Sequence, residues 1–318
     1  MKYRKLGKSS ISVSEIGFGT WGIGGTYKDA IGYGPTEDKE TLKALLYAKD
    51  HGVNFYDTAP LYGHGHSEEM LGKAFQHCRD KVIISTKVGI KNFTGGLDFS
   101  PKYIVDSLNQ SLQRLRTDYV DALLLHSPPI EILKSSESIF QQLELLQKAG
   151  KVRLIGISGK TPSDCLEAIN LYPFDLIQAN FSLVDQRMLE IGLLDCCQDH
   201  QIGVVGRTPL CFGFLTGKYS RDTKFDSNDH RSRWGKKQIE LWFNGFEEFK
   251  EIFMKKYTGT QLALKYCLTY PISTTIPGMI NVNHVKENIY SVSDEYLEAD
   301  ALSKIDELYQ NSFFFNSH

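Results

Sequence analysis

Eight short apolar segments recur along the chain, and a stretch with helical periodicity follows each of them. The apolar segments cover residues 16–21, 53–56, 82–86, 120–125, 153–157, 175–179, 203–206 and 273–276. They are continuous apolar runs, which are typical of parallel strands that are covered on both faces. Eight strand–helix units predict an α/β fold, the closed (β/α)8 TIM barrel, in preference to an open sheet.

Capping residues and glycines mark the expected helices between these strands. We expect helices at residues 36–52, 67–77, 236–254, 260–268 and 295–310, further helices starting at Ser100, Thr161 and Asn281, and others around 139–150 and 189–197. Residues 1–16 predict a β-hairpin, and residues 209–233 a long irregular segment. No linker interrupts the pattern, so we expect residues 1–318 to form a single domain. A doubly wound sheet is the competing architecture, but no Gly-x-Gly-x-x-Gly pattern follows an early strand.

The composition argues against several classes of function. The 318 residues carry 36 basic and 38 acidic side chains, a formal net charge of -2, which gives no global attraction to nucleic acid or to a membrane. No apolar run approaches the roughly 20 residues of a membrane span, and the N-terminus lacks the apolar core of a secretory signal. The six cysteines show no Cys-x-x-Cys spacing. We therefore expect a cytoplasmic protein with reduced thiols and no metal site.

Polar side chains stand where three consecutive apolar segments end. Asp57, Lys87 and His126 follow these segments directly, and Tyr62 lies in the glycine-flanked loop after Asp57. The carboxyl ends of TIM-barrel strands meet at one face, where the active site lies. A phenol has a pKa of about 10, and a neighbouring ammonium lowers that pKa by favouring the phenolate. Tyr62 is therefore the candidate proton donor, and Lys87 is the candidate ammonium that lowers the pKa of Tyr62. Asp57 would pair with Lys87, and His126 would bond a carbonyl oxygen.

Each of these residues alone has an ordinary structural explanation. Tyr62 is one of sixteen tyrosines and could be a plain loop residue. His126 alone could be a hydrogen-bonded histidine at a strand end, and Asp57 and Lys87 alone could form a structural ion pair in the barrel. Their position at the ends of consecutive strands favours one shared pocket that handles protons.

Several motifs occur in the same order as in a known enzyme family. Residues 55–63 (FYDTAPLYG), 84–87 (ISTK) and 119–126 (YVDALLLH) contain the four candidate residues. Residues 152–158 (VRLIGIS), 209–210 (PL), 213–218 (GFLTGK), 276–278 (IPG) and 287–288 (EN) follow them. Over essentially its whole length the chain resembles the aldo-keto reductases. This resemblance implies a TIM barrel that reduces an aldehyde or ketone by hydride transfer from a nicotinamide dinucleotide. Tyr62 would be the general acid, and Asp57, Lys87 and His126 the other catalytic residues.

The same resemblance assigns residues to the dinucleotide. Ser158 and Gln178 would bond the nicotinamide carboxamide, and Arg207 takes the position of an aromatic side chain that stacks on the nicotinamide. Lys218 and the backbone of residues 210–217 would hold the pyrophosphate. The expected cofactor-binding residues are Gly19, Thr20, Trp21, Asp57, Ser158, Gln178, Arg207, Thr208, Pro209, Leu210, Gly213, Leu215, Gly217, Lys218, Ile276, Pro277, Gly278, Ile280, His284, Glu287 and Asn288. The small-molecule carbonyl substrate would contact Trp21, Tyr56, Tyr62, His126 and Trp234.

Two departures from the family pattern concern the cofactor. Gly159 stands where the family usually has Asn after the serine, which removes one contact to the carboxamide. Residues 278–284 lack the Arg or Lys that usually pairs with the 2′-phosphate of NADP, and His284 and Lys286 are the basic candidates there. We expect NADP(H) as the cofactor, with NAD(H) as the alternative.

Three other functions fit parts of the pattern. An NAD(P)-dependent sugar or alcohol dehydrogenase on the same scaffold would use Tyr62 as a phenolate base. A dinucleotide-sensing binding subunit with slow turnover would keep the cofactor site, although the intact catalytic set argues against it. A phosphate-binding barrel isomerase ranks last, because that chemistry does not need the Tyr–Lys–His set.

Overall fold

A closed barrel of eight parallel strands forms the centre of the molecule. The computed structural model describes residues 1–27, 30–253, 256–292 and 295–311. The barrel strands are β3 (Phe18–Gly19), β4 (Phe55–Asp57), β5 (Ile83–Val88), β6 (Val120–His126), β7 (Val152–Ser158), β8 (Leu176–Asn180), β9 (Gly203–Arg207) and β10 (Thr274–Ile276). Each strand pairs with the next one along the chain, and parallel bridges between Ile16 and Thr275 and between Gly19 and Gly278 join the first strand to the last. The predicted TIM barrel is confirmed.

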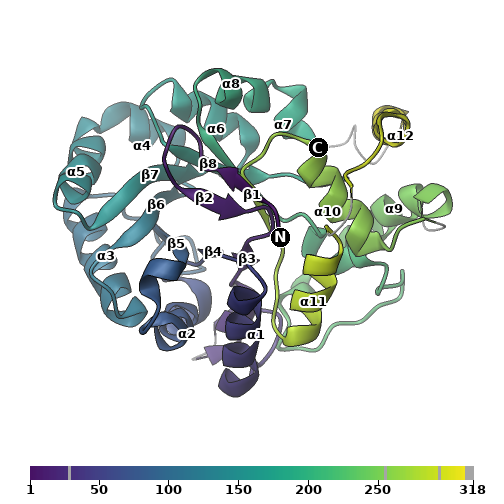
Figure 1. Cartoon of the computed structure of the whole chain (residues 1–318), viewed down its shortest axis with the longest axis horizontal. Helices are drawn as coiled ribbons and strands as arrows, with labels where there is room; N and C mark the ends of the chain where they lie inside the picture. The colour runs from purple at the N-terminus through teal and green to yellow at the C-terminus, as the bar shows by residue number, and fades with distance from the viewer. Residues whose placement is uncertain (28–29, 254–255, 293–294, 312–318) are drawn as a thin grey trace.

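Helices surround the barrel and cover the outer faces of its strands (Figure 1). They are α1 (Asp38–Asp50), α2 (His66–Phe75), α3 (Pro101–Leu115), α4 (Ile130–Ser135), α5 (Glu137–Lys148), α6 (Pro162–Ile169), α7 (Arg187–Glu190), α8 (Leu193–Asp199), α9 (Lys236–Phe253), α10 (Gly259–Thr269), α11 (Val282–Tyr290) and α12 (Ala299–Asn311). The expected helix around 189–197 is divided into α7 and α8, because Gly192 adopts a left-handed conformation with φ of 69°. The expected end of α9 at Met254 lies outside the described residues.

The predicted helix starts are confirmed where the capping side chain has no competing partner. The Ser100 hydroxyl accepts a hydrogen bond from the Tyr103 N–H, and Thr161 forms a reciprocal capping box with Asp164. The helix expected at residues 67–77 begins one residue earlier, at His66, and Ser67 does not cap it, because the Ser67 hydroxyl donates to Thr20 Oγ1 at 2.7 Å instead. A tertiary hydrogen bond thus replaces the local one.

An N-terminal hairpin closes the amino-terminal end of the barrel. Its strands are β1 (Tyr3–Lys5) and β2 (Ser12–Ser14), and it crosses the centre of the helical ring in Figure 1. An ion pair between the half-buried Arg4 and the buried Glu15, with Nε 2.7 Å from Oε1, anchors this hairpin. Arg4 also donates to the carbonyl of Leu268 at the end of α10 and to the carbonyl of Ile272 before β10. These contacts tie the hairpin to the last strand–helix units and leave the opposite end of the barrel open for a site.

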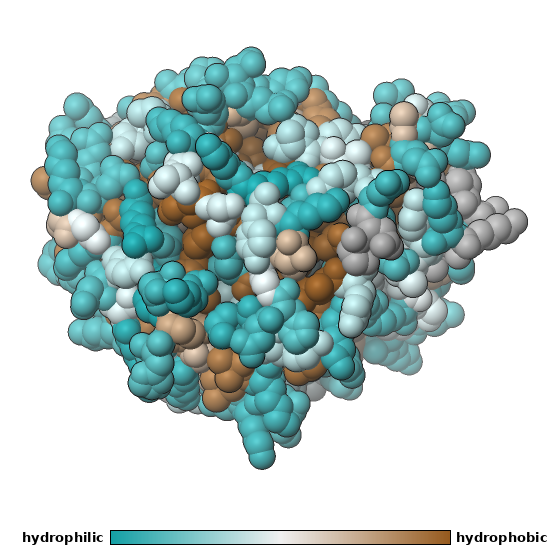
Figure 2. Space-filling model, in the orientation of Figure 1, coloured by the Kyte–Doolittle hydropathy of each residue, from teal (hydrophilic) through white to brown (hydrophobic). Residues whose placement is uncertain are grey.

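The surface on the hairpin side is mainly hydrophilic, and apolar side chains occur there in small groups (Figure 2). The large apolar residues that are most exposed lie on separate elements; they include Tyr3, Leu97, Leu145 and Tyr290. None of the described helices is both long enough and apolar enough to cross a membrane.

We predict that Arg4→Met lowers the free energy of unfolding by about 3 kcal/mol, because Glu15 then remains buried without its cation. Urea denaturation followed by circular dichroism measures the change. Lys102→Met is the control, since Lys102 forms only an exposed pair with Asp106 on α3; its urea midpoint should match the wild type. Equal midpoints for both variants would contradict the assigned role of Arg4.

Candidate active site

Three strand ends and one loop bring Asp57, Tyr62, Lys87 and His126 together. Asp57 ends β4, Lys87 lies near the end of β5, and His126 ends β6. Lys87 Nζ lies 2.6 Å from Asp57 Oδ2, 2.9 Å from the Thr58 carbonyl and 3.3 Å from the Tyr62 hydroxyl. Those three acceptors use all three protons of the ammonium. Because Lys87 donates to the Tyr62 oxygen, the Tyr62 proton remains available to a group in front of it.

Close packing of two glycine-containing loops positions Tyr62. The tyrosine opens a short 3-10 helix, Tyr62–Gly65, and its ring packs edge-on against Trp21 with centroids 5.1 Å apart. A Cβ atom at Gly63 would lie 2.2 Å from the Gly24 carbonyl oxygen, and Gly63 has a positive φ of 61°. Only glycine fits this contact without moving the backbone. The rings of His126 and Tyr62 lie edge-to-face, with centroids 6.4 Å apart and an angle of 85° between the ring planes.

Burial and the charge of Lys87 shift the pKa of Tyr62 in opposite directions. Burial raises the pKa of the phenol, the Lys87 charge lowers it, and the resulting pKa lies above the usual value of 10.0. The sequence predicted the lowering effect of Lys87 but not the larger effect of burial. Tyr62 is therefore a protonated phenol at neutral pH, which suits a proton donor.

Burial also determines the charge of His126. Burial and then the charges of Lys87 and Arg207 lower the pKa of His126 well below 6.5, so the imidazole is neutral at pH 7. Burial lowers the pKa of Lys87 as well, but the carboxylate of Asp57 and the Tyr62 oxygen outweigh it, and the pKa ends above 10.5. This group of residues thus combines the neutral phenol of Tyr62, the neutral imidazole of His126 and the fixed ammonium ion of Lys87.

A chain of hydrogen bonds connects Asp57 to neighbouring strands. Gln178 on β8 donates from Nε2 to Asp57 Oδ1 at 2.8 Å, and the Ser158 hydroxyl on β7 donates to Gln178 Oε1 at 2.9 Å. Arg207 at the end of β9 donates from Nη2 to the Gly159 carbonyl at 2.8 Å. The side chains of β4, β7, β8 and β9 are therefore fixed relative to one another.

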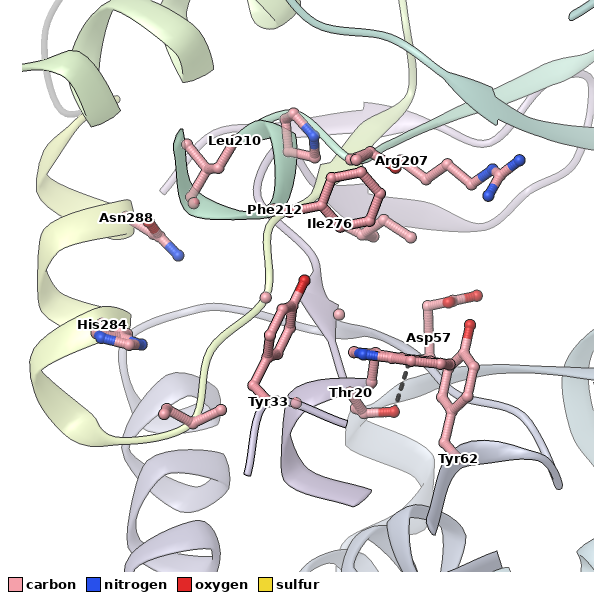
Figure 3. Close-up of a pocket in the computed structure, with 18 of the residues that line it drawn as sticks. Thr20, Tyr33, Asp57, Tyr62, Arg207, Leu210, Phe212, Ile276, His284 and Asn288 are labelled. Carbon is pink, nitrogen blue, oxygen red and sulfur yellow. Dashed lines mark hydrogen bonds between the residues drawn. The ribbon is translucent and has the colours of Figure 1, made fainter. Parts of the chain in front are cut away.

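One elongated cavity of about 430 Å³ opens in front of these residues. Figure 3 shows Asp57, Tyr62 and Arg207 on one side of it, His284 and Asn288 from α11 on the other, and Tyr33 between them. The expected cofactor residues that line it are Gly19, Thr20, Trp21, Asp57, Ser158, Gln178, Arg207, Thr208, Pro209, Leu210, Gly213, Lys218, Ile276, Gly278, Ile280, His284, Glu287 and Asn288. Tyr62 and His126 line it too. Most of the expected site thus meets in one place.

A few expected residues lie elsewhere. Leu215 belongs to the hydrophobic core, and Gly217 and Pro277 do not line the cavity. Lys87 donates to the Tyr62 hydroxyl but does not itself line the cavity.

Two residues expected to contact the substrate, Tyr56 and Trp234, do not line the cavity in front of Tyr62. Tyr56 is fully buried, stacks on Phe18, contacts the tilted ring of Phe75, and donates its hydroxyl proton to the Val53 carbonyl. It faces the helices because successive residues of a strand point to opposite faces, and its neighbour Asp57 takes the inner face. Trp234 lines a second cavity of about 330 Å³, which shares Thr208 and Phe212 with the cavity in front of Tyr62, and Trp234 does not line the latter.

The loop after β3 and the loop after β9 contribute cavity residues that were not expected from the sequence. These are Tyr33, Phe212, Tyr219, His230 and Arg231. The His230 N–H donates to the Gly32 carbonyl at 2.9 Å, so the loop after β9 pairs with the loop after β3. Residues 229–231 (DHR) lie in the segment expected to be irregular, and the loop that they contact depends on the tertiary structure.

The end of the cavity near α11 contains paired charges. Lys218 Nζ lies 2.9 Å from Glu287 Oε2, and the Thr260 hydroxyl donates to Glu287 Oε1 at 2.8 Å. Burial and the nearby charge of Lys218 lower the pKa of His284, which is neutral at pH 7. Within the described part of the chain, no group of three or more His, Cys, Asp or Glu side chains could hold a metal ion.

Comparison with known proteins shows the family of this chain. The model of the aldo/keto reductase family matches residues 15–310. An aldo-keto reductase of Schizosaccharomyces pombe whose name specifies NADP(+) is 31% identical over 303 residues, which are 90% of this chain and 85% of the relative. The NADH-specific methylglyoxal reductase of Escherichia coli is 30% identical over 319 residues, 95% of this chain and 96% of the relative.

A solved structure of similar fold supports the same assignment. The holo form of aldo-keto reductase AKR11C1 from Bacillus halodurans superposes with a TM-score of 0.80 at 28% identity. The superposition covers 97% of this chain and 96% of that one. The chain belongs to the aldo/keto reductase family of oxidoreductases.

Proposed function

We propose that this chain reduces the carbonyl group of an aldehyde or ketone, with Tyr62 as the proton donor. The observation that carries the proposal is the Tyr62 hydroxyl 3.3 Å from Lys87 Nζ, beside His126 and at one end of a long cavity. A bound dihydronicotinamide dinucleotide would supply the hydride for the carbonyl carbon.

The lining of the cavity suits a dinucleotide at both ends. Arg207 Nε and Asn288 Nδ2 are buried and have no hydrogen-bond partner among the described residues. Such atoms call for a ligand or water, because an unpaired buried donor costs free energy. Ser158 and Gln178 would hold the carboxamide near Tyr62, while Lys218 and Asn288 would hold the phosphate and adenosine portions.

Each catalytic residue has a defined part in proton transfer. Tyr62 is protonated at neutral pH and gives its proton to the carbonyl oxygen. The Lys87 ammonium stabilises the phenolate that is left, and Asp57 keeps that ammonium in place. Neutral His126 bonds the same carbonyl oxygen and helps to orient it.

The raised pKa of Tyr62 weighs against the dehydrogenase alternative at neutral pH, because oxidation needs the phenolate as a base. A dinucleotide-sensing subunit would need the same cavity but no proton donor at its end. The hydrogen-bonded Tyr62–Lys87–Asp57 set therefore favours an enzyme that turns over.

Tyr62→Phe should lower kcat for reduction about 10²–10⁴-fold, because it removes the donated proton and little else. The dissociation constant of the dinucleotide should stay nearly unchanged. Absorbance of the reduced dinucleotide with a panel of aldehydes gives kcat, and protein fluorescence gives the dissociation constant. Tyr103→Phe, on the exterior helix α3, is a matched control. Wild-type kcat in Tyr62→Phe would remove Tyr62 from the mechanism.

The pH profile of reduction should be level between pH 6.5 and about 10. The pKa of His126 lies below the lower limit and that of Tyr62 above the upper one, so neither group changes charge in between. Reduction should fall only when Tyr62 loses its proton at higher pH, and alcohol oxidation should rise toward that pH. Steady-state kcat at saturating dinucleotide measures both; a bell-shaped reduction profile centred near pH 7 would contradict the assignment.

We weigh NAD(H) above NADP(H), in contrast to the expectation from the sequence. At the α11 end of the cavity, Glu287 neutralises Lys218 and His284 is uncharged at pH 7. Arg231, which also lines the cavity, is paired with Asp229 at 2.6 Å. Among the described residues, the basic side chains lining that end of the cavity therefore offer no free charge to a 2′-phosphate. A carboxylate at this place favours a ribose 2′-hydroxyl over a phosphate.

His284→Arg should raise the ratio of kcat/KM for NADPH to that for NADH by about 10–100-fold, because a guanidinium can bond a 2′-phosphate. Parallel assays with the two reduced dinucleotides give the ratio. His200→Arg, on the exposed end of α8, adds the same charge far from the cavity and should leave the ratio unchanged. An unaltered ratio in His284→Arg would place the 2′-position elsewhere.

A further inference from the structure

The reacting end of the cavity carries one positive charge more than it has negative charges. Asp57 neutralises Lys87 at 2.6 Å. Arg207 is a second cation, and its Nη2 donates only to carbonyl oxygens, 2.8 Å from Gly159 and 3.3 Å from Lys160. None of the ion pairs found between described residues involves Arg207. Its charge is therefore held in place without an ion pair of its own, since Asp185 and Asp57, the carboxylates whose charges act on it, are paired with Arg187 and Lys87.

The field of Arg207 reaches the residues that handle the carbonyl. Arg207 lines the same cavity as Tyr62 and His126, and Figure 3 shows it over Asp57 and Tyr62. Its charge contributes to the lowered pKa of His126, after burial and Lys87. Its Nε atom is buried and unpartnered within the described structure. Water screens such a charge weakly, so its field extends across the reacting end.

A nicotinamide ring differs in charge between its two redox forms. The oxidised ring is a cation, whereas the reduced ring is neutral. Hydride transfer requires the ring to contact the carbonyl carbon, and Tyr62 and His126 hold the oxygen of that carbonyl. The ring must therefore lie within the field of Arg207 in either redox form.

We propose that Arg207 makes this site bind the reduced dinucleotide more tightly than the oxidised one, and thereby favours carbonyl reduction over alcohol oxidation. The inference rests on the proposed function. Like charges repel, so an uncompensated guanidinium weakens binding of the cationic ring and leaves binding of the neutral ring almost unaffected. After reduction of the substrate, the same repulsion speeds release of the oxidised dinucleotide.

The two dinucleotides form a matched pair of probes. NAD+ and NADH share the same adenosine and pyrophosphate groups, so the ratio of their dissociation constants isolates the charge of the ring. Isothermal titration calorimetry on the whole chain measures both constants. The wild-type ratio of the NAD+ constant to the NADH constant should exceed one.

Variants at Arg207 separate its charge from its structural contacts. Arg207→Gln removes the charge but keeps a donor, and it should lower the ratio about tenfold through tighter NAD+ binding. Arg207→Lys keeps the charge and should keep a ratio close to wild type. Arg153→Gln removes an exposed arginine from the start of β7, so it changes the net charge equally and should leave the ratio unchanged.

Each outcome supports or overturns the inference. A lower ratio in Arg207→Gln with a preserved ratio in Arg207→Lys supports it. Equal weakening of both ligands, with an unchanged ratio, means that Arg207 only holds the loop at Gly159 and overturns it. Arg207→Met serves in the same comparison if circular dichroism shows that Arg207→Gln is unfolded. If the wild type binds neither NAD+ nor NADH, NADP+ and NADPH serve as the same matched pair, and failure to bind any of the four would instead refute the proposed function.

Discussion

The buried ion pair between Asp57 and Lys87 is the interaction on which the site depends. Both side chains are almost fully buried, at 3% and 1% exposure, so each has lost its hydration. Their attraction offsets that loss only because further hydrogen bonds complete both groups: Gln178 donates to Asp57, and Lys87 donates to Thr58 and Tyr62. The pair joins β4 to β5 and, through Gln178, to β8. It stabilises one arrangement of the barrel mouth more than it stabilises the fold.

The parallel barrel explains why so much of this site could be predicted from the sequence. Residues that end consecutive parallel strands must share one edge, so Asp57, Lys87 and His126 could be grouped without coordinates. The apolar runs and the caps at Ser100 and Thr161 likewise fixed most helix and strand positions, because they depend on local hydrogen bonds. Features that follow from strand order, or from hydrogen bonds between residues close in the sequence, could therefore be predicted from the sequence.

Features that depend on distant parts of the chain were not accessible. Ser67 bonds Thr20 rather than its own helix, since the two meet only in the folded barrel. The pKa of Tyr62 follows from burial under the loops, whose depth no pattern reports. Tyr56 is a different case: strand alternation beside Asp57 already implied that it faces the helices, and this signal went unused.

The N-terminal hairpin and the cavity lie at opposite ends of the barrel. Lys8 in the hairpin bonds Gln201 just before β9, whereas the cavity residue Arg207 comes at the end of that strand. A surface, a bead or a fused protein attached through Met1 would therefore contact the closed end and leave the mouth facing solution. Immobilisation through this end should preserve access for small molecules, which makes the chain a convenient component for flow reactors and electrode coatings.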